Sequence, residues 1–317
     1  MVNKEEKKGY LVIISPKQFG YSLGYFYYCE YLSDFSIIYL CRNQGLKHID
    51  SPSNTEVHFI SGHSFLISTI IHLKKLGKRN IYAYFINYQR FCSMYTFFLN
   101  NGKRILDIRT GEISKNPLRR YILNYLVRAE AFLFDNIFVL SESLRNYLQL
   151  PIVKSHITPL GAVDLGYADR NYDRLSLLYV GTFFNRDIYK TIKGLAIFKE
   201  RNPHVPVSYT IIGFGPERDK TRISKEMANN NFSDKDVKIL GRIHQSEMRH
   251  CFIEANVGVS FIPIVDYFNV QPATKTLEYI ISGLICIATA TPENSRVINH
   301  ENGILTRDSE VDFAEGL

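Results

Sequence analysis

The sequence contains few cysteines and no long apolar run. Its five cysteines are scattered over 317 residues, without a CxxC pair or a Cys/His spacing that suits zinc. This usage argues against a disulfide framework or a structural zinc and indicates a reducing compartment. No apolar stretch reaches the roughly 20 residues that a membrane-spanning helix needs, and the first one, 10–14, is too short for a signal peptide. We therefore expect a cytoplasmic protein.

Several catalytic and nucleotide-binding motifs are also missing. The chain has no GxxxxGK[ST], GxSxG or HExxH sequence, and no DxD follows an expected strand. The lack of DxD bears on sugar transferases, since one large class of them binds a metal through it. We accordingly expect no catalytic metal and no other cofactor. Gly213 and Gly215 form a GxG after a strand, but no third glycine completes GxGxxG, so the signal for a dinucleotide is weak.

Positive charge is concentrated in the first half of the chain. Residues 1–150 hold 19 Lys and Arg against 11 Asp and Glu, whereas residues 151–317 hold 19 against 20. The first half is also dense in Tyr and Phe. Such a half suits an anionic partner, namely a membrane surface or a lipid-linked phosphate, although an ordinary solvated basic face fits equally well. Nucleic acid is disfavoured because no nucleic-acid-binding motif is present.

Strand and helix patterns alternate along the whole chain, as in a doubly wound parallel sheet. The pattern breaks over 151–173, which looks like a linker, and restarts at 176. We therefore predict an α/β protein of two Rossmann-like domains, 1–160 and 161–317, facing a cleft. Expected strands lie at 11–15, 36–40, 56–60, 80–85, 104–108, 136–140, 176–180, 208–212, 237–240, 257–262 and 284–288; expected helices include 63–76, 118–134, 141–148, 190–200 and 246–254.

The most informative segment runs from Gln271 to Thr289. It predicts a loop carrying Lys275, a helix carrying Glu278, a stop at Gly283 and then a buried strand. A lysine beside a helix N-terminus suits a phosphate. A carboxylate one turn further suits a ribose diol, because it can accept two hydroxyl hydrogen bonds. The pattern indicates a nucleoside-diphosphate site; the alternative is an ordinary αβ unit with a surface Lys and Glu.

Five fragments of the second half, in order, resemble the retaining family-4 glycosyltransferases, which have the two-domain GT-B architecture. Fainter similarity extends upstream, so that the resemblance covers roughly 136–306, whereas 1–135 match only in pattern. Pro272–Tyr279, which reads P-x-x-K-x-x-E-Y, resembles the "P-x-K-x-x-E-Y" motif that is typical of one subset of that family. The five fragments are Leu177–Thr182 with Arg186, Thr210–Glu217, Val237–Ile243, Pro272–Thr289 and Asn302–Leu305.

The resemblance implies transfer of a sugar, with retention, from a UDP- or GDP-linked donor to a glycan or polyprenyl-linked acceptor in surface polysaccharide biosynthesis. The enzyme would be cytoplasmic, at most peripheral at the inner face of the membrane. Arg186 and Lys275 would neutralise the leaving diphosphate without a metal. Acceptor-side residues would be Gly20, Gly24, Asp107 and Arg109, although a buried Asp107–Arg109 network is an equal alternative. Donor-binding residues would be Gly181, Thr182, Lys190, Gly213, Gly215, Arg242, Ile243, Thr274 and Glu278.

The sequence departs from that family at two positions. Val270 stands where many members carry a first Glu that helps to orient the donor sugar. Gly181-Thr182 replaces the usual Gly-Arg, so Arg186 is expected to supply the cation, with Lys190 one helical turn on. A binding module that has lost its chemistry and a nucleotide-sugar epimerase stay open as alternatives. Residues 311–317 look like the opening of a helix cut early, which leaves open whether the chain is truncated or short.

Overall fold

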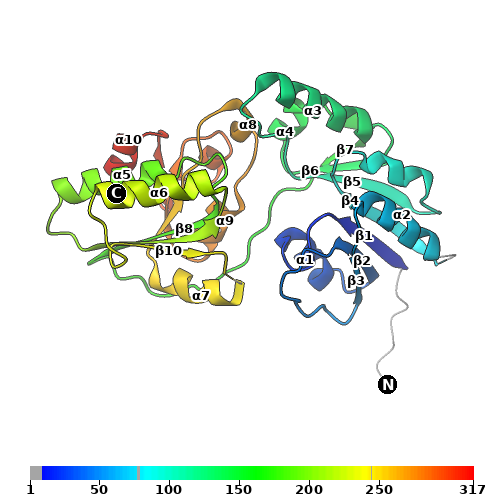
Figure 1. The fold of residues 1–317 in the computed structure, drawn as a ribbon, viewed down its shortest axis with the longest axis horizontal. Coiled ribbons are helices and arrows are strands. Elements are labelled where there is room, and N and C mark those ends of the chain that lie inside the picture. The colour runs from blue at the N-terminus through cyan, green and yellow to red at the C-terminus, as the bar shows by residue number, and fades with distance from the viewer. Residues whose placement is uncertain (1–8, 77–78, 244) are drawn as a thin grey trace. The chain divides into compact units, whose positions relative to one another are not determined.

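The computed structural model describes residues 9–76, 79–243 and 245–317. The chain divides into two compact units, Met1–Leu160 and Gly161–Leu317. Each unit contains one parallel sheet with helices on both faces (Figure 1). The predicted alternation of strands and helices is therefore present in both halves.

The first unit is a seven-stranded sheet in the order β3-β2-β1-β4-β5-β6-β7. The strand order reverses direction between β1 and β4, which makes that pair the topological switch point. Helix α1 packs on one face through the side chains of Tyr25 and Cys29. The elements are β1 (Tyr10–Ser15), α1 (Leu23–Tyr31), β2 (Ser36–Arg42), β3 (Thr55–Ile60), α2 (Phe65–Lys75), β4 (Ile81–Asn87), the 3-10 helix η1 (Cys92–Phe97), β5 (Lys103–Ile108), α3 (Pro117–Ala131), β6 (Asn136–Val139), α4 (Glu142–Tyr147), the 3-10 helix η2 (Ile152–Lys154) and β7 (Ser155–Ile157).

Helix starts in this unit follow capping chemistry. The Asn116 side chain accepts a hydrogen bond from Arg119 N at 3.0 Å, and Pro117 occupies the first turn of α3. Ser141, the predicted N-cap of the 141–148 helix, accepts one from Leu144 N at 3.1 Å. These side chains satisfy backbone donors that have no partner within the helix.

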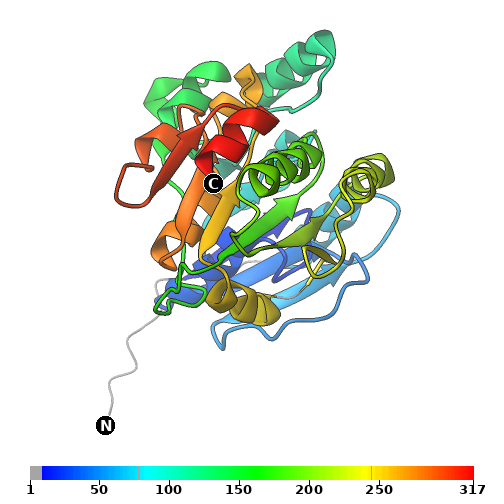
Figure 2. The same ribbon diagram turned by 90° about the vertical axis from the view of Figure 1, so that its left-hand side faces the viewer.

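The second unit is a six-stranded sheet in the order β10-β9-β8-β11-β12-β13, the strand order of a dinucleotide-binding fold. Its switch point lies between β8 and β11. Helices α5, α6 and α10 lie on one side of this sheet (Figure 2). The elements are β8 (Leu175–Thr182), α5 (Tyr189–Arg201), β9 (Val207–Phe214), α6 (Glu217–Asn229), β10 (Val237–Gly241), α7 (Gln245–Glu254), β11 (Val257–Ser260), α8 (Asp266–Asn269), α9 (Thr274–Ile281), β12 (Ile285–Thr289), η3 (Asn294–Arg296), β13 (Gly303–Thr306) and α10 (Glu310–Gly316).

Alternating side chains of β8 build the two layers of this core. Leu177 and Tyr179 are buried in the cluster that α5, α6 and α10 complete. Leu178, between them, is buried in the opposite cluster with Phe252 of α7 and Tyr279 of α9. A strand that is apolar on both faces is expected in a parallel sheet covered by helices on each side.

Some predicted boundaries were wrong. Residues 155–157 lie within the segment expected as a linker, yet they form β7 at the edge of the first sheet. Three residues, two of them Ser155 and His156, are too few and too polar to give a strand signal. Lys275 is in α9 and not in a preceding loop.

The packing of α9 on β11 gives a stability prediction. A Cβ added to Gly258 would lie 2.3 Å from the ring of Tyr279, which is fully buried. Gly258→Ala should therefore lower the free energy of unfolding by about 1–3 kcal/mol, the usual cost of overpacking a core. Urea denaturation measures it.

The matched control is Gly161→Ala, because a Cβ there meets no atom within 4 Å. It should change the free energy of unfolding by no more than about 0.5 kcal/mol. Equal effects of the two substitutions would contradict the close packing of Tyr279 on β11.

Candidate active site

The carboxyl ends of β8 and β9 bring two glycines together. Gly181 has a φ of 152° and pairs in register with Gly213. A Cβ on Gly213 would lie 1.9 Å from the carbonyl oxygen of Gly181, and one on Gly215 would lie 2.7 Å from Cβ of Phe183. No side chain fits at Gly213 or Gly215, so the backbone itself forms the surface at this end of the sheet. Ligands of such folds bind at this edge, beside the switch point.

Arg186 lies in the loop that follows β8. Its neighbours Asn185 and Asp187 have φ values of 55° and 50°, in the left-handed region that Asn and Asp tolerate better than most residues. The guanidinium carbon of Arg186 is 3.9 Å from the ring centre of Phe268 in α8. Burial lowers the pKa of Arg186. Within the described ranges, its guanidinium has no carboxylate or hydrogen-bond partner.

Lys275 is the second residue of α9 and reaches the same edge. Its Nζ is 3.9 Å from the ring centre of Tyr179 and 3.5 Å from the position that a Cβ on Gly181 would occupy. Desolvation lowers the pKa of Lys275 well below its usual value, and repulsion from Arg186 lowers it further. In the part of the chain that the structure describes, its ammonium makes no ion pair or hydrogen bond, although the charge of the nearby Glu278 partly opposes the lowering of its pKa.

Arg186 and Lys275 thus form a pair of half-buried cations that repel each other. Both rest on aromatic rings, which stabilise a cation without neutralising it. Buried charges are normally paired, because desolvation is otherwise costly. An anion bound between the two would remove the repulsion and supply the missing partner. A diphosphate has the charge and the number of acceptor oxygens for both.

Helix α9 is fixed by buried polar contacts on three sides. The Thr276 hydroxyl is 2.7 Å from the Ser260 hydroxyl of β11 and donates to Asn294 Oδ1 at 3.0 Å. The Tyr279 hydroxyl accepts from Val180 N of β8 at 2.8 Å. No side chain caps the start of the helix, where Ala273 is the N-cap. An uncapped helix start of this kind leaves backbone N–H groups without side-chain partners and favours an anion.

Glu278 lies one turn after Lys275 and is 8% exposed. Burial raises the pKa of its carboxyl to about 7, and the nearby Lys275 charge opposes that rise. Across the described residues, no hydrogen-bond donor contacts the Glu278 carboxylate. The alternative of a surface Lys and Glu is therefore wrong for both side chains. A buried carboxylate without a donor is suited to ligand hydroxyls.

Arg242 and Ile243 follow β10. The guanidinium carbon of Arg242 is 3.7 Å from the ring centre of Phe214, whose side chain is 47% exposed at the end of β9. Ile243 is half-buried and packs with the cluster around α7 and α9. Gly241, with a φ of 68°, turns the chain between the strand and Arg242. The exposed Phe214–Arg242 stack offers a flat surface on which a planar ring can lie.

Three other predicted donor residues are placed less directly. The Lys190 ammonium donates to the carbonyl oxygen of Asp308 at 2.8 Å, so it is already engaged. The Thr182 hydroxyl accepts from Phe184 N at 3.2 Å and shapes the loop that carries Arg186. Thr274 is the first residue of α9. Direct contact of Lys190, Thr182 and Thr274 with a nucleotide-sugar donor stays a prediction.

Sequence reasoning missed the residues that support the cations. Phe268 belongs to α8, a four-residue helix with too short a pattern to predict. Tyr179 reads as an ordinary core residue of a strand, and its burial agrees with that, although its ring also carries Lys275. Val270, where a first Glu was expected, ends α8 as its C-cap.

The acceptor-side residues of the first unit form a network of their own. Asp107 is fully buried and its Oδ2 accepts hydrogen bonds from the Tyr25 hydroxyl and, at 2.7 Å, from Arg109 Nε. Arg109 also donates to the Tyr28 hydroxyl at 2.9 Å. A Cβ on Gly24 would lie 2.9 Å from Arg109 Nη1, so glycine leaves room for the guanidinium. The Asp107–Arg109 pair of the alternative interpretation is thus present.

Gly20 is placed in the loop between β1 and α1, with a φ of 83° and Ile49 packed against it. Burial raises the pKa of Tyr25 and that of Tyr28. Among the described residues, no group of three His, Cys, Asp or Glu side chains could hold a metal ion.

Burial of Glu278 leads to a prediction about stability and pH. Its folded-state pKa, about 7, is above the usual value of 4.5, so folding favours the protonated form. Ionisation of Glu278 should lower the free energy of unfolding progressively between pH 4.5 and 7, with the full cost above that range. Glu278→Gln should therefore stabilise the protein at pH 8 by on the order of 2 kcal/mol and by little at pH 5.

Thermal unfolding at the two pH values measures this difference. Glu217→Gln is the matched control, because the Glu217 side chain is 81% exposed in α6. The control should not stabilise the protein at either pH. If Glu278→Gln behaves like the control, Glu278 does not titrate as a buried carboxyl.

Comparison with known proteins identifies a similar family and similar folds. Residues 174–317 match the family model described as "Glycosyl transferases group 1", which covers most of the second unit. No curated protein matches the chain significantly. Among solved structures, sucrose-phosphate synthase from Thermosynechococcus elongatus superposes with a TM-score of 0.74 at 16% identity, over 98% of this chain and 88% of that one.

Two further structures have a similar fold. Anabaena HepE, solved in complex with UDP, has a TM-score of 0.67 at 11% identity, over 97% of this chain and 88% of that one. WaaG, a glycosyltransferase involved in lipopolysaccharide biosynthesis, has a TM-score of 0.70 at 13% identity, over 96% and 89%. At such identities the likeness establishes the fold. The chain has the GT-B architecture of two Rossmann-like units, and residues 174–317, in its second unit, are similar to the glycosyltransferase group 1 family.

Proposed function

We propose that the protein is a retaining, metal-independent glycosyltransferase that takes a sugar from a nucleoside-diphosphate donor. The observation that carries the proposal is the pair of unneutralised cations, Arg186 and Lys275, beside the uncapped start of α9. The family match of residues 174–317 and the UDP complex of HepE support a nucleotide-sugar donor.

Sugar transfer requires charge stabilisation on the leaving group. As the bond to the anomeric carbon breaks, the sugar gains oxocarbenium character and negative charge grows on the diphosphate. Arg186 and Lys275 would bind that charge more strongly as it develops, which lowers the barrier. Because the aromatic rings of Phe268 and Tyr179 hold both cations in place beforehand, little reorganisation is needed during the reaction. The leaving phosphate itself is our candidate for accepting the proton of the attacking hydroxyl.

Glu278 and the Phe214–Arg242 stack would hold the nucleoside. The Glu278 carboxylate has open acceptor positions for the two ribose hydroxyls. The exposed Phe214 ring and the guanidinium on it would flank the base. The close backbones of Gly213 and Gly215 would let the donor lie against the end of the sheet.

The acceptor that we propose is a glycan or a lipid-linked glycan, in surface polysaccharide synthesis at the inner face of the membrane. The basic, aromatic first half of the chain supports an acceptor that carries phosphate. The role of WaaG in lipopolysaccharide biosynthesis is compatible with it. Gly20 and Gly24 flank the loop through which we expect the acceptor to approach.

The roles of the two cations can be tested by turnover. Release of nucleoside diphosphate should be screened with UDP- and GDP-sugars in the presence of a glycan mixture. Arg186→Ala and Lys275→Ala should each lower turnover by about 10²–10³-fold, as loss of a transition-state charge stabiliser does. EDTA should leave the rate of the parent protein unchanged.

Lys193→Ala is the matched control, because Lys193 lies on α5 and pairs with Glu226 at 3.9 Å. It should turn over like the parent. Inhibition by EDTA that manganese reverses would contradict the metal-free mechanism. Full activity of Lys275→Ala would contradict binding of the diphosphate at this edge of the sheet. Nucleotide binding without turnover in the parent would instead favour a binding module that has lost its catalytic activity.

The proposed contact between Glu278 and the ribose can be tested with a thermodynamic cycle that combines a protein substitution with a change in the ligand. Calorimetry should compare UDP with 2′-deoxy-UDP, or the guanosine pair if GDP binds better. Glu278→Gln should weaken binding of the ribonucleotide by about 1.5–3 kcal/mol, as expected for a hydrogen bond to a charged group. The parent should lose affinity for the deoxynucleotide, and the variant should discriminate much less between the two.

Discrimination that is unchanged in a folded Glu278→Gln variant would show that the 2′-hydroxyl does not contact this carboxylate. Lys193→Ala again serves as the control and should keep the discrimination of the parent.

A further inference from the structure

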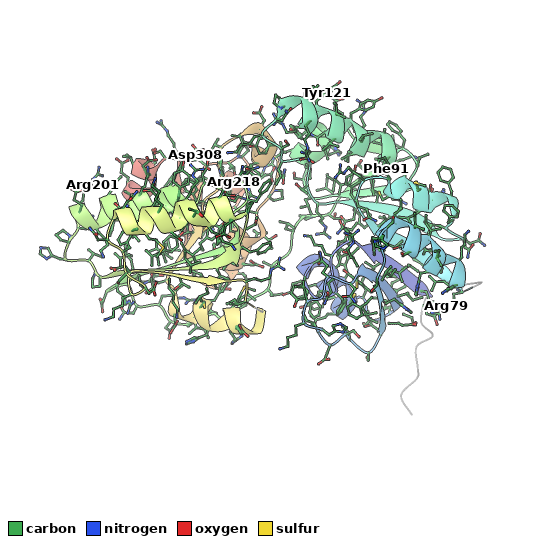
Figure 3. The ribbon with its side chains drawn as sticks, viewed as in Figure 1. Arg79, Phe91, Tyr121, Arg201, Arg218 and Asp308 are labelled. Atoms are coloured by element: carbon green, nitrogen blue, oxygen red, sulfur yellow. The ribbon has the colours of Figure 1, made fainter. Side chains whose placement is uncertain are left out.

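Helix α3 of the first unit presents an apolar stripe to solvent. None of the helices in the described ranges has the length and hydropathy of a membrane span. The buried positions of α3 are Val127, Glu130 and Ala131. Figure 3 shows Tyr121, 72% exposed, on the outer side of the helix. The exposed large apolar side chains of α3 are Leu118, Tyr121, Ile122 and Tyr125, and Phe132 and Leu133 follow directly.

These side chains recur with helical spacing. Leu118, Ile122 and Tyr125 are separated by four and three residues, which places them on one face of an α-helix. In an ordinary surface helix such a stripe faces the core. In α3 the stripe faces outward, whereas the inward side is partly polar, with Glu130 bonded to the backbone N–H groups of Phe91 and Ser93 at 2.9 Å.

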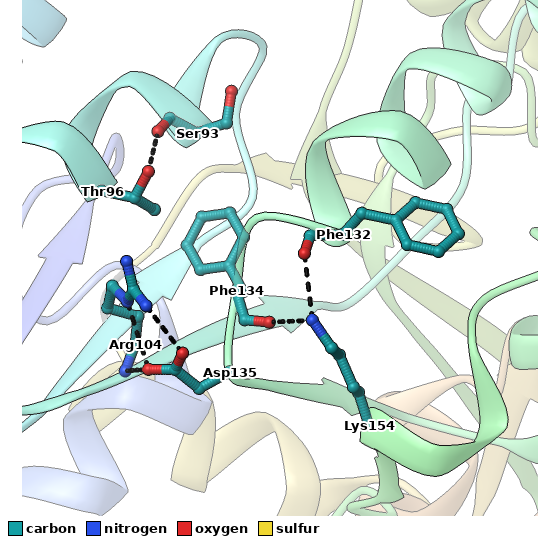
Figure 4. A network of polar contacts seen from close by, with 7 residues as sticks. All are labelled: Ser93, Thr96, Arg104, Phe132, Phe134, Asp135 and Lys154. Atoms are coloured by element: carbon teal, nitrogen blue, oxygen red, sulfur yellow. Dashed lines mark hydrogen bonds and ion pairs between the residues drawn. The ribbon is translucent and has the colours of Figure 1, made fainter.

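The apolar surface continues past the end of the helix. Lys154 Nζ donates to the carbonyl oxygens of Phe132 and Phe134, both at 3.0 Å, and so fixes η2 against the end of α3 (Figure 4). Ile152 and Val153, which belong to the same 3-10 helix as Lys154, are 69% and 95% exposed. We call the exposed side chains of α3, its end and η2 the α3 face.

Basic side chains border the α3 face. Lys115 and Arg119 are exposed at the start of the helix, and Arg128 lies further along it, bonded only to the neutral side chain of Gln149 in the described chain. The single acidic residue of α3 is Glu130, which is buried. The α3 face therefore combines exposed aromatic and aliphatic side chains with unneutralised positive charge.

We propose that the α3 face docks the protein on an anionic lipid surface. Apolar and aromatic side chains would enter the boundary between head groups and acyl chains, as the apolar side of an interfacial helix does. The neighbouring Lys and Arg side chains would contact anionic head groups. A second copy of this chain is a poorer occupant, because it would bring a face of the same positive charge. This inference concerns a surface separate from the donor residues and does not depend on the proposed transfer reaction.

Vesicle co-sedimentation of the full chain tests the proposal. Vesicles of phosphatidylcholine alone are compared with vesicles containing about one third phosphatidylglycerol, at low and high salt. Binding should require the anionic lipid and should fall with salt. Tyr121→Ser/Tyr125→Ser should reduce binding at least 10-fold. Lys115→Glu/Arg119→Glu should reduce it about 10- to 30-fold, given the attraction expected per basic residue.

Matched controls carry the same changes on other surfaces. Tyr31→Ser/Tyr167→Ser removes two tyrosines that are 70% and 66% exposed elsewhere. Arg218→Glu/Lys225→Glu reverses two exposed charges of α6, where Figure 3 labels Arg218. Both controls should bind vesicles like the parent. Thermal shift with UDP and GDP runs in parallel and should be the same for all four variants and the parent.

Three results would overturn the proposal. The first is no binding to either vesicle, or equal binding to both. The second is equal loss of binding in the variants and their controls. The third is a dimer, seen by sedimentation velocity, that Tyr121→Ser/Tyr125→Ser dissociates, which would assign the α3 face to a protein contact. Failure of nucleotide binding in the parent would contradict the proposed transferase and leave the docking result standing.

Discussion

The candidate active site depends on two cations that the protein does not neutralise. Arg186 adds to the desolvation that lowers the pKa of Lys275, and the two side chains are held on the rings of Phe268 and Tyr179. Much of the nearby structure serves to position them. Tyr279 and Thr276 fix α9 to β8 and β11, and the glycines at the ends of β8 and β9 keep the space in front of Lys275 clear of side chains. Binding of an anion, as we propose, would recover the free energy that this repulsion costs the unliganded protein.

Burial of Glu278 also lowers the stability of the unliganded protein. Its carboxyl group lies one helical turn from Lys275 and has no hydrogen-bond donor among the described residues, and burial raises its pKa to about 7. The left-handed backbone of Asn185 and Asp187 around Arg186 is a further departure from the most stable local geometry. Such departures gather at one edge of one sheet, the switch point between β8 and β11. A site that must bind and release a charged ligand is the expected place for them, because function and stability compete there.

The sequence places Lys275, Glu278 and Gly283 close together because they lie within the short stretch 275–283 of the chain. It predicts a loop at Lys275, whereas the structure places this residue in the first turn of α9, one helical turn before Glu278. Arg186 could be predicted only from similarity to a family, because its separation from Lys275 along the sequence does not show that the two residues are close in space. The supports of the cations could not be predicted: Phe268 lies in a four-residue helix, and Tyr179 looks like any core residue. Strand β7 escaped notice because three mostly polar residues at a sheet edge leave no pattern.

Whether a positive charge is neutralised within the fold also distinguishes two groups of basic residues in the first unit. Arg109 is bonded to the buried Asp107 and to Tyr28, so its charge is satisfied within the fold, and a structural role explains both residues without a ligand. Lys115, Arg119 and Arg128 border an exposed apolar stripe, and in the described chain no carboxylate pairs with them. Exposed charge alone would mean little, because solvated arginines are common. Its combination with large apolar side chains, which water solvates poorly, is what motivates our proposal of a lipid surface as the partner.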